Sequence, residues 1–133
     1  VVGLDCKWEP ALGGKTPNPV SAVQLSLPDG TAALMRRLCF RTPDKLLTQP
    51  FDVVFLQVGV NVNLDASYLF RDYKVEVANT VDSRTHARQC LVETPSRSLA
   101  GMVSALIGKT SRKDSAICLS QWSSYQLTPE QAR

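Results

Sequence analysis

The sequence predicts an α/β domain built on a mixed sheet with helices packed on its faces. Three strand-like segments follow one another in the first 40 residues, separated by turn residues, and predict an antiparallel meander. After them the chain alternates between helical and strand-like segments. A meander followed by such alternation is typical of a mixed sheet flanked by helices. With 133 residues there is room for one domain of this kind, spanning residues 1–133.

The three strands of the meander are predicted at residues 1–8, 20–27 and 31–40. In the first, Asp5 and Lys7 share one face, because side chains two residues apart on a strand point to the same side. Residues 9–19 hold three prolines and two glycines and predict an irregular loop. The sequence Pro-Asp-Gly at 28–30 predicts the turn before the third strand.

The alternating half is predicted from capping residues and apolar patterning. The nearly continuous apolar run at 53–60 is typical of a strand buried on both faces. Ser98 and Gly108 predict the two ends of an amphipathic helix. The elements predicted after the meander are a short helix at 45–49, the strand at 53–60, a helix at 64–73, a strand at 75–81 ending at Asp82, the helix at 99–107, and a mostly irregular segment at 109–127 anchored by Trp122.

Composition narrows the function classes without choosing one. The net charge is +3, which permits nucleic-acid binding but does not indicate it. No apolar run approaches the roughly 20 residues of a membrane span, and we expect no membrane partner. The four cysteines form no Cys-x-x-Cys pair, so a zinc site is not predicted. We interpret all four as reduced, in a cytosolic or nuclear protein.

Both ends of the chain lie inside predicted elements. There is no initiator methionine, and the chain opens within a strand. Near the other end, Thr128 and Gln131 have the spacing of a capping box, with Pro129 at the first helical position. A helix of about five residues is not stable alone in water. We therefore expect a C-terminal helix that continues beyond Arg133.

The chain opens with Val-Val-Gly-Leu-Asp-Cys-Lys-Trp. This segment resembles the first motif, Gly-hydrophobic-Asp-x-Glu-Trp, of the exonuclease domain of the Werner syndrome protein and its plant relatives. The likeness continues, in the family's order and spacing, through residues 18–25, 58–60 with Asp65, 98–109 and 119–131.

This resemblance implies a ribonuclease H-like fold and the four-acid (DEDD, tyrosine subtype) chemistry of 3′→5′ exonucleases. In that family two acids of the first motif, one of the second and one of a third Tyr-x-x-x-Asp motif hold two ions, Mg²⁺ or Mn²⁺. The ions lie roughly 4 Å apart and stabilise the attacking and leaving oxygens of phosphodiester hydrolysis.

Carried over residue by residue, the resemblance matches Asp5 to the first acid and Asp65 to the second-motif acid. Lys7 stands where the family has its glutamate, and the third motif is expected after Arg133. An ammonium group cannot coordinate Mg²⁺. A unit charge 4 Å away is worth roughly 4 kcal/mol at an effective dielectric constant of about 20. We therefore expect a degenerate exonuclease-like domain, a pseudoenzyme in which Lys7 pairs with Asp5 or Asp65 and which is retained for nucleic-acid or protein binding.

Two alternatives stay open. The domain is an active metal-dependent exonuclease on DNA or RNA if an acid beyond Arg133, or one from a partner in an oligomer, completes the site. It is a protein-interaction or decoy module if neither metal nor nucleic acid binds. Glu9 is a poor replacement for the missing acid, because it lies about 13 Å along the strand from Asp5 and Pro10 ends that strand.

Other polar and aromatic residues are weighed against ordinary structural roles. Trp8, Asn61 and Asn63 are candidate nucleic-acid contacts, with Trp8 equally explained as a core anchor. Asp65 taken alone is explained by the helix dipole. The remaining candidates have a structural or surface role as the favoured explanation: Asp82 as a turn residue, His86, Trp122, and the basic pairs Arg36–Arg37 and Arg112–Lys113.

Overall fold

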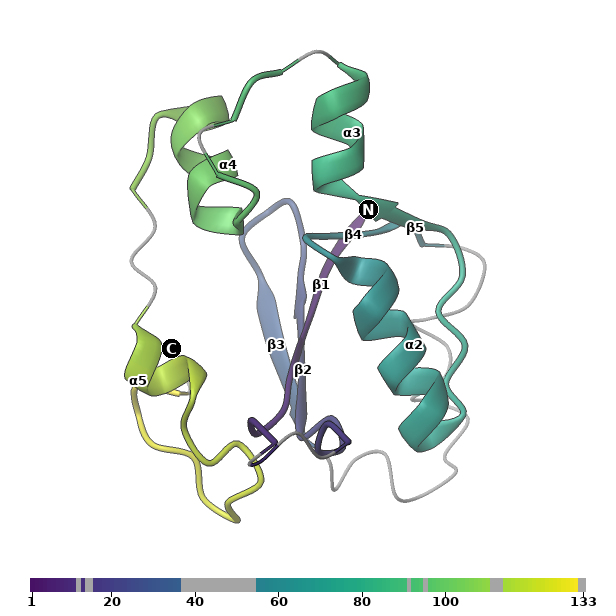
Figure 1. Cartoon of the computed structure of the whole chain (residues 1–133), viewed down its shortest axis with the longest axis vertical. Helices are drawn as coiled ribbons and strands as arrows, with labels where there is room; N and C mark the ends of the chain where they lie inside the picture. The colour runs from purple at the N-terminus through teal and green to yellow at the C-terminus, as the bar shows by residue number, and fades with distance from the viewer. Residues whose placement is uncertain are drawn as a thin grey trace.

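The computed structural model describes residues 1–11, 13, 16–36, 55–90, 92–94, 96–110 and 114–131. Within these residues it contains a five-stranded sheet in the order β3-β2-β1-β4-β5 (Figure 1). The strands are β1 (Val2–Lys7), β2 (Ala22–Ser26), β3 (Ala32–Arg36), β4 (Gln57–Gly59) and β5 (Thr80–Asp82).

The pairing of the strands confirms the predicted mixed sheet. β1 is antiparallel to β2, with Leu4 opposite Leu25, and β2 is antiparallel to β3. β4 joins the other edge of β1 in parallel, and β5 joins β4 in parallel. The first 36 residues therefore form the meander, and the parallel strands come from the half in which strands and helices alternate.

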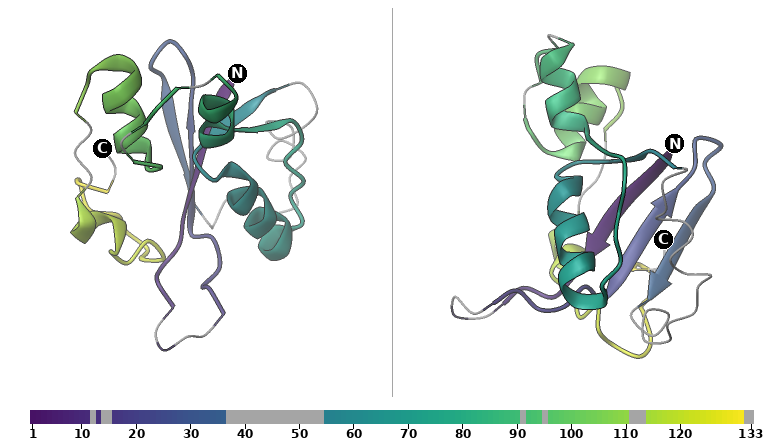
Figure 2. Two further views of the ribbon diagram at one scale, coloured as in Figure 1. Left: turned by 45° about the horizontal axis from the view of Figure 1, so that its top comes forward. Right: turned by 90° about the vertical axis from the view of Figure 1, so that its right-hand side faces the viewer.

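Helix α2 (Val62–Tyr73) lies along one face of this sheet (Figure 2). Apolar side chains of β1, β2 and α2 meet there, and Lys74 ends the helix in a left-handed conformation. The buried residues of this core are Leu4, Cys6, Val20, Val23, Val62, Leu69 and Val75. Asp5 and Lys7 alternate with Leu4 and Cys6, so they lie on the opposite side of β1 from this core.

The segment after α2 differs from the prediction. We predicted a strand at 75–81, but β5 is limited to Thr80–Asp82. It is followed by helix α3 (Ser83–Gln89), which was not predicted. Asp82 caps this helix by accepting a hydrogen bond from the backbone N–H of Arg84. Ala87 is the one buried residue of α3, so the sequence lacks the apolar stripe that would have predicted a helix.

Helix α4 (Leu99–Ile107) has the predicted ends. The Ser98 hydroxyl accepts from the N–H of Gly101, and Gly108 ends the helix with a φ of 64°. Its apolar stripe is less buried than amphipathicity predicts, because only Met102 is buried whereas Leu106 and Ile107 are exposed.

The C-terminal segment contains the short helix α5 (Ser115–Cys118) and the predicted anchor Trp122, which is 2% exposed. The capping box is confirmed: Thr128 and Gln131 exchange hydrogen bonds of 2.8 and 3.3 Å between backbone N–H groups and side-chain oxygens. No helix among the described residues has the length and apolar character needed to cross a bilayer.

Some predictions lie partly or wholly outside the described residues. They are the helix at 45–49, the ends of the strands predicted at 31–40 and 53–60, Arg37, Cys39 and the pair Arg112–Lys113. Within the described part of 53–60, Phe55 and Leu56 are exposed, which contradicts the prediction of burial on both faces there. Cys6, Cys90 and Cys118 are free thiols.

Candidate functional site

An ion pair lies on the exposed face of β1. The Lys7 ammonium group donates to Oδ2 of Asp5, two residues earlier on the same strand. The Asp5 side chain is 49% exposed and that of Lys7 24% exposed. Of the two pairings predicted for Lys7, the structure therefore contains the one with Asp5.

Asp65 lies beside this pair, in the first turn of α2, and is 5% exposed. Its carboxyl group accepts a hydrogen bond from the backbone N–H of Cys6. The register of β4 on β1 covers only Val2 and Gly3, so β4 ends before it reaches Cys6. The start of α2 therefore contacts β1 at Cys6, beyond the residues that pair with β4.

Burial and charge leave the Asp65 carboxyl unusually weak as an acid. Burial, followed by the nearby charge of Asp5, raises the pKa of Asp65 to about 7. Lys7 and the Cys6 N–H oppose this increase in pKa without cancelling it. Burial also raises the pKa of the Cys6 thiol, so that side chain stays neutral.

These residues do not fit a two-metal centre. One oxygen of Asp5 already accepts from an ammonium group, which is no ligand for a hard cation. The described part of the chain holds no cluster of three or more His, Cys, Asp and Glu side chains suited to a metal.

Trp8, the aromatic residue next to the site, packs against helix α2. Its ring meets the ring of Tyr68 edge-on, with centroids 4.9 Å apart. The Arg71 guanidinium lies 4.3 Å from the centroid of the same tyrosine. Trp8 remains partly exposed, but its orientation is set by α2.

The two asparagines predicted as nucleotide contacts also have partners. Oδ1 of Asn61 accepts from Nη2 of Arg84 at 2.7 Å, and Oδ1 of Asn63 accepts from the Thr80 hydroxyl at 2.7 Å. Both bonds tie the start of α2 to the neighbouring β5–α3 segment. Their nucleic-acid role stays a prediction.

The Glu9 side chain binds the C-terminal segment. Its Oε1 accepts from the backbone N–H and hydroxyl of Ser123, at 3.2 and 2.5 Å. That Glu9 does not replace a metal ligand stays a prediction.

The remaining candidates have the following positions. Asp82 forms a 2.8 Å ion pair with Arg84 in addition to capping α3, and His86 is exposed on that helix. Arg36 is not a solvated surface residue, because it donates to the backbone carbonyls of Ser124 and Tyr125.

Arg84, which contacts both Asp82 and Asn61, was not predicted as a residue of this region. The available signal was the sequence Asp-Ser-Arg at 82–84, in which an N-cap residue is followed by helix-compatible residues. We did not predict a helix there, so Arg84 was not placed beside the start of α2.

The chain is similar in sequence to known 3′-5′ exonucleases. The chain is 28% identical to a 3′-5′ exonuclease of Arabidopsis thaliana over 131 residues, covering 98% of this chain and 46% of that protein. It is also 28% identical to the mouse bifunctional 3′-5′ exonuclease/ATP-dependent helicase WRN, covering 98% of this chain and 9% of that protein. The chain thus spans less than half the length of these curated relatives. No protein-family profile matches it.

Two solved structures have a similar fold. The EXD2 exonuclease domain soaked in Mn is 30% identical, with a TM-score of 0.58, over 98% of this chain and 66% of that one. Brucella melitensis NrnC bound to pGG superposes with a TM-score of 0.78 at 18% identity, over 98% of this chain and 61% of that one, and supports the fold alone.

The strand order, together with the similarity to these solved structures, defines a domain of the ribonuclease H-like class. More narrowly, the chain is homologous to 3′-5′ exonuclease domains.

Proposed function

We propose that this domain binds a nucleic-acid strand without cleaving it, because a lysine–aspartate ion pair takes the place of the metal centre. The observation that carries the proposal is the contact between Lys7 and Asp5 beside the buried Asp65. Homology to 3′-5′ exonuclease domains supports nucleic acid as the ligand.

The charges explain why an ion would be excluded. Lys7 contributes +1 at a position where the related first motif carries −1, a change of two units. At an effective dielectric constant of about 20, each unit is worth roughly 4 kcal/mol at 4 Å.

Two variants of the full-length protein test the role of Lys7. Lys7→Glu restores a carboxylate, and Lys7→Gln removes the positive charge without adding one. We expect calorimetric titration with Mn²⁺ to show at least tenfold tighter binding for Lys7→Glu than for wild type, a difference of about 1.4 kcal/mol. Lys7→Gln should lie between them, and the affinity of Lys7→Glu should rise from pH 6 to pH 8 as Asp65 loses its proton.

A gel assay with labelled single-stranded DNA and RNA tests the activity itself, with Mg²⁺, Mn²⁺ or chelator present. We expect wild-type protein to retard the strand without shortening it. Metal-dependent shortening by wild type would overturn the proposal in favour of an active exonuclease completed by residues beyond Arg133 or by a partner. Neither retardation nor shortening would favour a protein-interaction module.

A further inference from the structure

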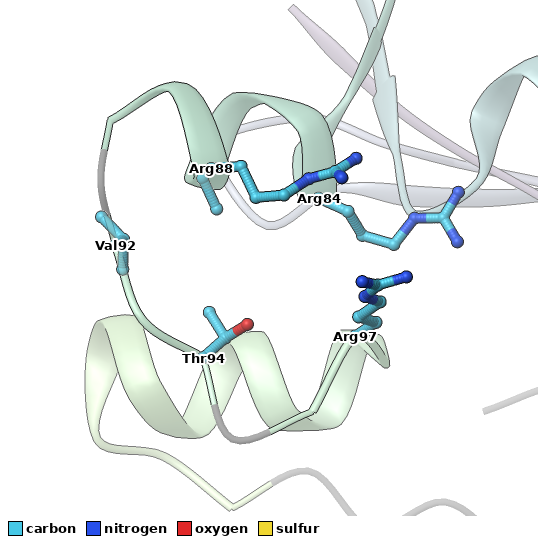
Figure 3. Close-up of a pocket in the computed structure, with 6 residues that line it drawn as sticks. Arg84, Arg88, Val92, Thr94 and Arg97 are labelled. Carbon is cyan, nitrogen blue, oxygen red and sulfur yellow. The ribbon is translucent and has the colours of Figure 1, made fainter.

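A pocket outside the candidate site is lined by three arginines. It has a volume of about 210 Å³ and lies between α3 and the segment that leads into α4 (Figure 3). Its lining residues are Arg84, Ala87, Arg88, Val92, Thr94 and Arg97. Figure 3 shows the side chains of the three arginines extending toward the same end of the pocket.

Of the three arginines, Arg88 and Arg97 have no carboxylate partner among the described residues, whereas Arg84 has one. Arg84 is paired with Asp82 at 2.8 Å, which cancels its charge and fixes its position. Arg88 and Arg97 are exposed, and neither forms an ion pair with a carboxylate of the described residues. The pocket therefore has an excess of about two positive charges, and like charges held together favour an anionic ligand.

The size and chemistry of the pocket limit the ligand. Pockets for drug-sized molecules usually measure about 300–1,000 Å³, so this one suits a single anionic group better than a whole nucleotide. The planar guanidinium fork matches the oxygens of phosphate in a bidentate manner. The Thr94 hydroxyl adds a donor on the pocket wall.

The pocket is connected to the candidate site through Arg84. Nη2 of this arginine donates to Oδ1 of Asn61 at 2.7 Å, and Asn61 directly precedes the helix that carries Asp65. β4 and β5 are parallel, with Gly59 paired with Asp82, so α2 and α3 both begin after the carboxyl ends of neighbouring strands. The starts of α2 and α3, which carry Asp65 and Arg84, therefore lie at the same edge of the sheet.

We propose that this arginine pocket binds a backbone phosphate of the nucleic-acid strand, at a distance from the position of Asp65. The inference rests on the proposed function, since it takes nucleic acid as the ligand of the domain. The pocket adds a sequence-independent contact, because phosphates carry no base information.

The test compares two double variants that each remove two positive charges. Arg88→Gln/Arg97→Gln removes the unpaired charges of the pocket, whereas Lys74→Gln/Lys109→Gln removes two exposed charges elsewhere. Binding of a labelled single-stranded oligonucleotide is followed by fluorescence anisotropy over a series of salt concentrations. Near-ultraviolet and far-ultraviolet circular dichroism checks that each variant is folded, and all four substituted side chains are exposed.

We expect the pocket variant to bind at least tenfold more weakly than wild type at about 0.1 M salt, with a log–log salt slope smaller by about 1.4 for the two lost contacts. The control variant should stay within about threefold of wild type. If both variants bind the oligonucleotide equally weakly, affinity depends only on overall charge. That result would overturn the phosphate site in the pocket and leave the proposed function standing.

Two other results overturn the inference differently. If wild type binds no oligonucleotide, both the proposed function and the pocket's ligand are wrong. If inorganic phosphate binds to wild type and not to the pocket variant, while oligonucleotide affinity is the same for both, the site takes a free small anion instead.

Discussion

At the residue scale, Asp65 combines deep burial with proximity to a second carboxylate. The folded protein holds a proton on it up to a pKa of about 7, whereas an unperturbed aspartate loses that proton near 3.8. Between these two values the folded state binds one more proton than the unfolded state. Stability from this group is therefore complete below pH 3.8 and is lost as the pH rises through about 7.

Asp65→Asn tests this titration because asparagine has the same shape and does not titrate. We expect wild type, relative to Asp65→Asn, to lose on the order of 2–3 kcal/mol of unfolding free energy between pH 5 and pH 8. Urea unfolding at each pH measures the difference in unfolding free energy between the two proteins. The contributions of the other titrating groups cancel in this difference. Parallel profiles for the two proteins would show that Asp65 is ionised throughout this range.

At the scale of elements, the position of α2 depends on a close approach between β4 and β1. A Cβ atom on Gly59 would lie 2.5 Å from the backbone carbonyl oxygen of Leu4 and 3.2 Å from Cβ of Val62. Neither neighbour moves without shifting a strand or a helix. Glycine at this position therefore lets α2 begin beside β1 and brings Asp65 to the ion pair.

Gly59→Ala should destabilise the protein by about 3 kcal/mol, the upper part of the range for overpacking. Gly3→Ala is the matched control, since its Cβ would meet chiefly the Ser26 hydroxyl, which rotates away. We expect Gly3→Ala to cost about 1 kcal/mol or less. Chemical denaturation of both variants measures these costs, and equal costs would contradict the role given to Gly59.

At the scale of the whole molecule, the C-terminal segment is joined to the sheet by polar contacts from distant parts of the chain. Glu9 binds Ser123, and Arg36 at the end of β3 binds two backbone carbonyls of the same segment. Trp122, which comes directly before the bonded residues 123–125 in the sequence, is buried. These bonds connect residues about 90 to 114 positions apart.

Replacing Arg36 tests this connection. We expect Arg36→Met to lower the unfolding free energy by about 2 kcal/mol, because it removes charge-assisted hydrogen bonds. Arg36→Lys keeps the charge without the fork and should recover only part of the loss. Amide hydrogen exchange at residues 123–125 should accelerate in the same order. Unchanged exchange in Arg36→Met would show that Trp122 and the Glu9–Ser123 contact hold the segment without Arg36.

Local patterns alone predicted the meander, the helix after β4 and both ends of α4, because alternation, turn residues and caps depend on neighbours in sequence. Helix α3 was not predicted because its sequence lacks a repeating apolar pattern. Ala87 is its only buried residue.

The sequence and its resemblance to a family selected Asp5, Lys7 and Asp65. Only the tertiary structure decided that Lys7 pairs with Asp5, that Asp65 is buried beside them, and that Arg84, Arg88 and Arg97 line one pocket. Such contacts join segments far apart in the chain, and burial and charge, which set the pKa of Asp65, depend on neighbours that only folding supplies.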